Sequence, residues 1–509
     1  MAQIRENYNT LKNIRQPFAL NLIFQYYGIV MANESKQKIT PRAEDYSQWY
    51  LDVIAAADMA EHAPVKGCMV IKPYGYAIWE NIQKVLNVQF KETGVENAYF
   101  PLLIPQSLLT REEDHVEGFA PEVAVVTKAG NKDLEEPLVV RPTSETIMYE
   151  TFSKWVQSYR DLPVLVNQWA NVVRWELRTR LFLRTTEFLW QEGHTVHATH
   201  DEADERARMM GDVYTKFAED YMAIPGIPGR KTESERFAGA IETYTLEAMM
   251  QDGKALQFAT SHNLGDNFAK AFDIMYLGED NEHHHAWQTS WGISTRSIGG
   301  LIMTHSDDKG LVLPPKIAPI HVVIIPIYKT DEERDSVSAA AQSLREKFGS
   351  DLEVKFDDRD HMRPGEKFFE WERKGVPVRI EIGPRDVADN NAVLVRRDTG
   401  EKSVIGQTDV VEVVTGLLQD IQQNLLQRAQ SLRDENTVSV DSWGDFTAAI
   451  EDSKFVLAHW DGTEATEKMI KNETGATIRC IPFDGKVESG VCVKTGEKSQ
   501  QRVVFAKAY

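Results

Sequence analysis

The chain has 509 residues, of which 42% are hydrophobic and 26% are charged. This is the composition of an ordinary globular protein, and it excludes a wholly disordered chain, a collagen-like chain and a coiled-coil rod. The length predicts about three domains at roughly 150 residues each. Lys and Arg number 57 against 77 Asp and Glu, and the net charge of −20 argues against coating nucleic acid by bulk charge, although a local basic surface remains compatible with it.

The three cysteines indicate a reducing compartment. They form no CxxC pair and are too few for a disulfide framework. We therefore expect a cytoplasmic protein.

Residues 18–30 (FALNLIFQYYGIV) come closest to a targeting or membrane segment. They are shorter than the ~18 to 20 apolar residues that a membrane span needs. Met31 follows directly, and we interpret residues 1–30 as an extension upstream of a natural start at Met31. A cleaved signal peptide and a genuine N-terminal appendage are the alternatives. We expect no membrane partner.

A mixed α and β pattern begins after the leader, residues 1–43, and defines a first domain over residues 44–315. Ile78, Ile82 and Leu86 have helical spacing and predict a helix that ends near Gly94. Further elements are predicted as strands over residues 97–104, 138–141, 163–169, 172–176 and 188–197, a helix that follows residues 142–145, and an amphipathic helix over residues 201–222.

Prolines at 314, 315 and 319 mark a boundary, after which β and α patterns alternate. Residues 316–432 therefore predict a β/α domain with a largely parallel sheet. Its predicted elements are strands over residues 320–327, 352–356, 376–382 and 392–395 and helices over residues 331–348, 365–374 and 408–432. Residues 433–509 predict a small α+β third domain.

Two separated arginines suggest a phosphate site. Arg174 and Glu176 lie at the end of a predicted strand, and a guanidinium there can grip a phosphate with two parallel hydrogen bonds. Phe188 on the next strand offers a flat face for a purine. Arg296 follows small residues and precedes an apolar run with helical spacing, so it lies at a predicted helix N-terminus that suits an anion. The simpler alternatives are a structural ion pair, a core phenylalanine and a glycine-rich turn.

These segments resemble the class II aminoacyl-tRNA synthetases. Arg174–Glu176 with Phe188 is similar to their motif 2, the segment 291–300 to motif 3, and residues 75–101 to motif 1. Within that class the chain is most similar to the prolyl-tRNA synthetases, over about residues 44–509. The segments that carry this resemblance are residues 141–145 (RPTSE), 188–194 (FLWQEGH) and 259–262 (ATSH).

The resemblance implies a fold and a reaction. The fold is α/β and α+β multidomain, with an antiparallel-sheet class II catalytic domain, a β/α anticodon-binding domain and a small C-terminal domain. The reaction activates L-proline with ATP and transfers the prolyl group to tRNA(Pro). Neither step needs a protein nucleophile, because alignment and charge neutralisation supply the rate. A synthetase for another amino acid and a non-catalytic RNA-binding or interaction protein are the alternatives.

The resemblance also implies site residues. Arg174 would contact the α-phosphate and the substrate carboxylate, Arg296 the γ-phosphate, and Phe188 the adenine. The rest of the ATP site would be Glu176, Arg184, Thr185, Gln257, Thr260 and Ser294. Besides Arg174, the proline pocket would contain Thr143, Glu145, Trp190, Glu192, His194 and His262. Mg²⁺ would accompany ATP, with Gln257 as a candidate contact.

Two further partners are implied. Residues 355–402 carry 11 basic and 11 acidic residues, a relatively basic stretch in an acidic chain, which suits RNA. The candidate anticodon readers there are Lys367, Glu372 and Arg385. Motif 1 implies a homodimer.

Two features of related enzymes are missing from the sequence. Many relatives bind zinc with four cysteines in the C-terminal domain, but only Cys492 remains here, with His459 near another expected position, so no zinc site is expected. Some bacterial relatives carry a hydrolytic insertion, but 92 residues from Gly193 to His285 leave no room for one. Three consecutive histidines at 283–285 are not expected to bind metal.

Overall fold

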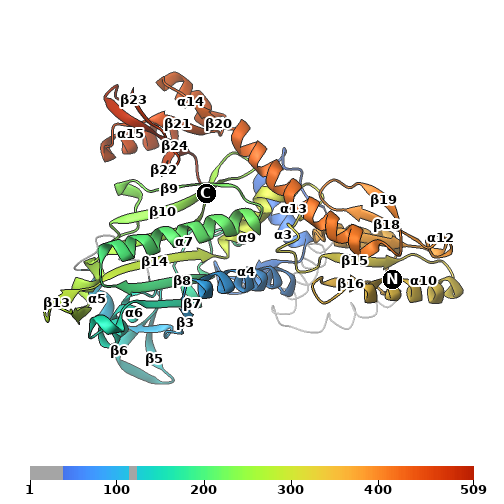
Figure 1. Cartoon of the computed structure of the whole chain (residues 1–509), viewed down its shortest axis with the longest axis horizontal. Coiled ribbons are helices and arrows are strands. Elements are labelled where there is room, and N and C mark those ends of the chain that lie inside the picture. The colour runs from blue at the N-terminus through green and yellow to red at the C-terminus, as the bar shows by residue number, and fades with distance from the viewer. Residues whose placement is uncertain (1–37, 114–122) are drawn as a thin grey trace, which may run out of the picture.

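The computed structural model describes residues 38–113 and 123–509 (Figure 1). The apolar stretch 18–30 and the interpreted start at Met31 lie outside the described residues. Across the part of the chain that is described, no helix is both long and apolar enough to cross a bilayer.

The first domain is built on an antiparallel sheet. Its central strands lie in the order β9 (Gly226–Arg230), β10 (Glu242–Met249), β11 (Ala255–Gly265), β14 (Trp287–Ser294), β8 (Glu187–His197) and β7 (Val164–Val173). The prediction of two strands over 163–169 and 172–176 was wrong, since Ala170 and Asn171 keep the ladder with β8 unbroken.

The predicted strand over residues 97–104 was also wrong. Only β3 (Glu96–Asn97) and β4 (Leu103–Pro105) are strands. Pro101 between them has no N–H to donate. The backbone of Phe100 is hydrogen-bonded to side chains and not to a neighbouring strand: its N–H donates to Gln168 Oε1 (2.6 Å) and its carbonyl accepts from Arg141 Nη1 (2.7 Å). β4 pairs with β6 (Lys132–Val140), which pairs with β5 (Val125–Ala129).

Helices cover this antiparallel sheet (Figure 1). α7 (His200–Asp220) begins at a Thr199–Glu202 capping box and packs its buried face on β11 and β14. α9 (Arg296–His305) packs on the same two strands. Gly193 in β8 lies against the Trp291 ring, where an added Cβ would come within 2.0 Å of the indole. Only glycine fits this crossing, which explains the glycine of the segment 188–194.

The other elements of the domain are shorter or lie at its margins. They are α3 (Tyr46–Ala56), β1 (Ala60–His62), β2 (Met69–Ile71), α4 (Pro73–Glu92), α5 (Gln106–Glu113), α6 (Glu145–Trp155), α8 (Asn267–Ala271), β12 (Met275–Leu277) and β13 (His283–His285), with 3₁₀ turns at Tyr159–Asp161 and Glu233–Glu235.

The second domain contains a mixed sheet rather than the largely parallel one that was predicted. β16 (Val354–Phe356), β15 (Val322–Pro326) and β17 (Val378–Ile382) are parallel, whereas β18 (Asn391–Arg396) and β19 (Lys402–Gly406) are antiparallel. β19 was not predicted, because it lies at the sheet edge with an exposed, polar start. The helices are α10 (Asp331–Lys347), α11 (Pro364–Arg373), α12 (Pro384–Ala388) and α13 (Val410–Glu435).

The C-terminal domain continues the antiparallel sheet of the first domain. α13 leads to it from the second domain (Figure 1). Its elements are β20 (Thr437–Ser439), α14 (Trp443–Glu451), β21 (Phe455–His459), α15 (Glu464–Thr474), β22 (Thr477–Pro482), β23 (Val487–Val491) and β24 (Lys498–Ala506). β22 pairs with β9 of the first domain, which extends one sheet to 12 strands within the described residues. The multidomain fold class is confirmed, but this junction was not predicted.

Candidate functional site

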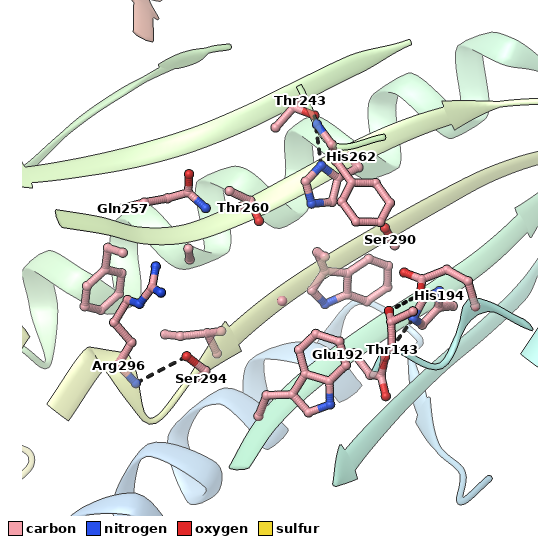
Figure 2. Close-up of a pocket in the computed structure, with 18 of the residues that line it drawn as sticks. Thr143, Glu192, His194, Thr243, Gln257, Thr260, His262, Ser290, Ser294 and Arg296 are labelled. Carbon is pink, nitrogen blue, oxygen red and sulfur yellow. Dashed lines mark hydrogen bonds and ion pairs between the residues drawn. The ribbon is translucent and has the colours of Figure 1, made fainter. Parts of the chain in front are cut away.

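A cleft of about 270 Å³ opens on the antiparallel sheet of the first domain (Figure 2). β8, β11 and β14 supply much of its lining. It brings together most of the residues predicted for ATP and proline: Thr143, Glu145, Arg174, Phe188, Trp190, Glu192, His194, Gln257, Thr260, His262, Ser294 and Arg296. Figure 2 shows Arg296 and Gln257 at one end and Thr143, Glu192 and His194 at the other.

One end of the cleft is cationic. Backbone carbonyls hold the two arginines, with Arg174 Nε donating to Pro142 O (2.9 Å) and Arg296 Nε to Leu183 O (3.0 Å). Burial lowers the pKa of Arg296, and the nearby charges of Arg184 and Arg174 lower it further. Like charges repel one another in a partly desolvated place, so an anion bound between Arg174 and Arg296 would be stabilised.

An aromatic surface adjoins the cationic end. The Arg174 guanidinium lies over the rings of Phe188 and Trp190, 5.5 Å from each centroid. The two rings meet edge to face at 6.1 Å. This arrangement fixes Arg174 by cation–π contact and leaves ring surface beside it for a planar base.

The other end is acidic and tightly hydrogen-bonded. Glu192 Oε1 accepts from the Ser144 hydroxyl and from Gln168 Nε2 (2.9 Å), and Glu192 Oε2 lies 3.2 Å from His194 Nε2. The Thr143 hydroxyl donates to Glu145 Oε2. Two carboxylates held this rigidly are suited to receive an ammonium group.

His262 is a neutral wall of the cleft. Its Nδ1 lies 2.9 Å from Thr243 Oγ1, and its ring lies 4.7 Å from the ring of Phe237. Burial, with a smaller contribution from His194, lowers the pKa of His262 to about 3. The side chain is therefore uncharged at physiological pH and acts through hydrogen bonding and shape.

Three predicted ATP residues do not line the cleft. Glu176, Arg184 and Thr185 lie in the connection from β7 to β8, where Arg184 Nη1 is 3.8 Å from Glu176 Oε2. Thr185 is buried, and its hydroxyl donates to Glu187 O (2.7 Å). Arg184 still adds charge beside Arg296. The ligand contacts of these three residues stay predictions.

Sequence reasoning missed several lining residues, including Glu235, Arg236, Phe237, Thr243 and Ser290. Strand pairing was the signal available for two of them. Thr243 lies opposite His262 in the β10–β11 ladder, and Ser290 lies opposite His194 in the β14–β8 ladder. The loop residues Glu235 to Phe237 carried no comparable signal.

The candidate anticodon residues do not gather at one point. Lys367 is buried, and its ammonium donates to Asp357 O (3.0 Å). Glu372 lines a separate cavity with Arg379 and Lys402, while Arg385 is exposed on α12. Base contacts by Lys367, Glu372 and Arg385 stay predictions, and the burial of Lys367 favours a supporting role.

In the C-terminal domain, side chains near the positions where related enzymes have zinc-binding cysteines are hydrogen-bonded to one another. Asp461 accepts from the hydroxyls of Thr463 (2.9 Å), Thr466 (2.7 Å) and Thr495 (2.9 Å). His459 Nδ1 lies 3.1 Å from Ser499 Oγ. Over residues 38–113 and 123–509, no three His, Cys, Asp or Glu side chains are grouped to hold a metal ion.

We therefore expect the purified protein to contain no stoichiometric zinc. Elemental analysis after dialysis checks this, and a melting temperature measured with and without a chelator should not differ. One tightly held zinc ion per chain would contradict the expectation, because a structural zinc site normally supplies part of the folding free energy.

Three protein-family descriptions match the chain. They are "tRNA synthetase class II core domain (G, H, P, S and T)" over residues 126–305, "Anticodon binding domain" over residues 321–417, and "Prolyl-tRNA synthetase, C-terminal" over residues 443–509.

Similar proteins share nearly the whole length. The proline–tRNA ligase of Porphyromonas gingivalis is 56% identical over 497 residues, covering 94% of this chain and all of the relative. That of Roseiflexus sp. is 56% identical over 479 residues, covering 93% of this chain and all of the relative. The prolyl-tRNA synthetase of Cryptosporidium parvum, solved with halofuginone and AMPPNP, is 40% identical with a TM-score of 0.89, covering 93% of this chain and all of that one. The chain belongs to the prolyl-tRNA synthetase family of class II aminoacyl-tRNA synthetases, the proline–tRNA ligases.

Proposed function

We propose that this cleft joins L-proline to ATP and then passes the prolyl group to tRNA(Pro), with ATP at the cationic end and proline at the acidic end. The observation that carries this assignment is the division of one cleft into an arginine end and a carboxylate end (Figure 2). The proline carboxylate attacks the α-phosphate of ATP and pyrophosphate leaves. The terminal ribose hydroxyl of the tRNA then takes the prolyl group and AMP leaves.

At the ATP end the arginines oppose the charge of the phosphates. Arg174 interacts electrostatically with Glu145 and Glu192 of the acidic end and with Arg296 of the cationic end, so it is near enough to both to serve each. It is therefore placed to hold both the proline carboxylate and the α-phosphate. Arg296 would take the γ-phosphate and Phe188 the adenine, with Gln257, Thr260 and Ser294 around them.

At the proline end a secondary ammonium needs acceptors and a ring needs an apolar wall. Glu145 and Glu192 supply carboxylate oxygens, while Thr143 and His194 orient them. Trp190 and neutral His262 supply the walls.

Mg²⁺ is proposed to enter with ATP. No ready three-ligand cluster exists among the described residues, which fits an ion bound chiefly by phosphate oxygens. Gln257 lines the cleft and could add one amide oxygen. The ion would neutralise phosphate charge.

We place this enzyme in the subgroup without an inserted editing domain. The residues from 194 to 284 are all described, and their elements α7, β9, β10, β11, α8 and β12 belong to the catalytic domain. The cytoplasm is its proposed location, in keeping with reduced cysteines and a role in translation.

A homodimer is proposed from an exposed apolar surface near the segment similar to motif 1. Tyr99 is 73% exposed, and Val88, Leu103, Val125 and Trp155 are also exposed. β3 beside them is the last strand of the sheet. Large apolar side chains gathered on neighbouring elements are typical of an interface.

Light scattering at micromolar concentration tests this assembly. We expect a mass near twice 57.8 kDa, and a Tyr99→Asp variant should shift the population toward monomer because it places a charge in the interface. A wild-type mass of 57.8 kDa would contradict the proposal.

The second step has its own test. Transcribed tRNA(Pro) should accept labelled proline, whereas tRNAs for threonine, glycine or histidine should not. This result separates the proposal from a synthetase for another amino acid and from a non-catalytic relative.

A further inference from the structure

One wall of the proline end is a segment between β9 and β10, residues 231–241, which we call the cover segment. Its residues Glu235, Arg236 and Phe237 line the cleft. The Phe237 ring lies 4.7 Å from the His262 ring, and the Phe237 N–H donates to Thr243 Oγ1 (3.1 Å). The position of the cover segment therefore sets the shape of the proline pocket.

The opposite side of the cover segment is held by the C-terminal domain. Glu467 on α15 accepts two hydrogen bonds at one oxygen, Oε2, from Thr232 Oγ1 (3.1 Å) and Ser234 Oγ (2.5 Å). The residue after Ser234 is Glu235, which lines the cleft. Glu467 is thus connected to the pocket wall although it does not line the pocket itself.

Side-chain packing gives the cover segment little support behind Ser234. A cavity of about 130 Å³ lies there, lined by Ser234, Glu235 and the α15 residues Glu464, Glu467, Lys468 and Lys471. Glu235 lines both this cavity and the substrate cleft. Because there is space behind Ser234, we expect the bonds to Glu467 to help hold this part of the segment, whose later residues Phe237, Ala238 and Ala240 pack on a buried apolar cluster.

The start of the cover segment is anchored independently. Lys231 Nζ donates to Glu247 Oε1 (2.7 Å) and to Arg479 O (2.9 Å), and all three residues are buried. Thr232 and Ser234 follow the anchored Lys231 in the sequence. Their bonds to Glu467 therefore lie between this anchor and the cleft-lining residues Glu235, Arg236 and Phe237.

We propose that Glu467 is a positioning residue for amino-acid binding: through the cover segment, the C-terminal domain holds the wall of the proline pocket. The inference rests on the proposed function of the cleft. Glu467 touches no substrate, so its effect should appear in the use of proline and not of ATP.

The test measures ATP–pyrophosphate exchange with Glu467→Ala. We expect the KM for proline to rise about 5- to 30-fold and the KM for ATP to stay within about twofold, since two hydrogen bonds to the wall are lost. Glu467→Gln keeps an oxygen acceptor and should restore most of the proline affinity. Glu464→Ala is the matched control, because Glu464 is exposed on the same helix and pairs with Lys468.

A second variant approaches the contact from the other side. Thr232→Val combined with Ser234→Ala removes both donors and should raise the KM for proline as Glu467→Ala does. Adding Glu467→Ala to that pair should change nothing further, because the three residues act through one contact. If Glu467→Ala fails to fold, the double variant Thr232→Val, Ser234→Ala tests the proposed role of Glu467.

An unchanged KM for proline in either folded variant, or fully additive effects, would overturn the inference. A merely structural role would lower the melting temperature without separating proline from ATP. If the wild type showed no proline-dependent exchange, the proposed function would fail, which is a different result.

Discussion

Arg174→Ala and Arg296→Ala should each lower the rate of proline-dependent ATP–pyrophosphate exchange by at least ~100-fold, because each removes a preorganised charge from the reacting phosphates. A backbone carbonyl already orients each guanidinium, through Arg174 Nε to Pro142 O and Arg296 Nε to Leu183 O. Lysine should rescue little at either site, since it lacks the planar fork of donors.

The matched control is Arg178→Ala. Arg178 is exposed in the connection from β7 to β8 that also contains Arg184, and it does not line the cleft. Its exchange rate should stay close to that of the wild type. Wild-type exchange by either Arg174→Ala or Arg296→Ala would refute the assignment of the cationic end to ATP.

Glu247→Ala should cost about 3 to 5 kcal/mol of unfolding free energy, because it removes the carboxylate that neutralises two buried cations, Lys231 and Arg479. Glu247 is fully buried between Lys231 and Arg479, with Arg479 Nη2 at 2.8 Å. This network joins the catalytic sheet to the C-terminal domain beside the β9–β22 pair. Denaturant titration measures the loss.

Glu242→Ala is the control on the same strand. Its carboxylate is 3.8 Å from a half-exposed Arg230, and such a pair contributes only ~0 to 1 kcal/mol. Equal losses for Glu242→Ala and Glu247→Ala would contradict the claim that burial makes the difference.

The same network predicts a dependence on pH. Burial raises the pKa of Glu247, but Lys231 and Arg479 outweigh burial and lower it below the ordinary glutamate range. The stabilisation by Glu247 is therefore fully present when the pH is above the pKa that Glu247 has in the unfolded chain. It is lost as the pH falls through the lower pKa that Glu247 has in the folded protein. Glu247→Ala should flatten this acid limb of the stability curve.

The motif segments allowed most of the site to be predicted from sequence. Arg174, Phe188 and Arg296 carry chemistry at fixed places on strands, and the strands bring them together. Phe237 could not be predicted in this way, since it reaches the cleft from a loop whose position depends on α15, more than 200 residues later.

Some elements of the fold could likewise be predicted from sequence, and others could not. Long elements such as α7 and β8 were predicted closely. One face of α7 is buried, which leaves a helical pattern in the sequence, whereas β8 is a long strand that is buried throughout its second half. The prediction of a strand over residues 97–104 failed because the backbone N–H and carbonyl of Phe100 are hydrogen-bonded to the side chains of Gln168 and Arg141 and not to a neighbouring strand. The pairing of β9 with β22 was not predicted, because pairing between strands that are distant in the sequence leaves no local sequence pattern.

Proline-dependent ATP–pyrophosphate exchange by the wild-type chain, compared across amino acids, tests the central claim most directly. We expect rapid exchange with proline and far slower exchange with threonine, glycine and histidine, since only a secondary ammonium and a small ring match the carboxylates and walls of the acidic end. Exchange that did not depend on proline, or that was fastest with another of these amino acids, would contradict the account.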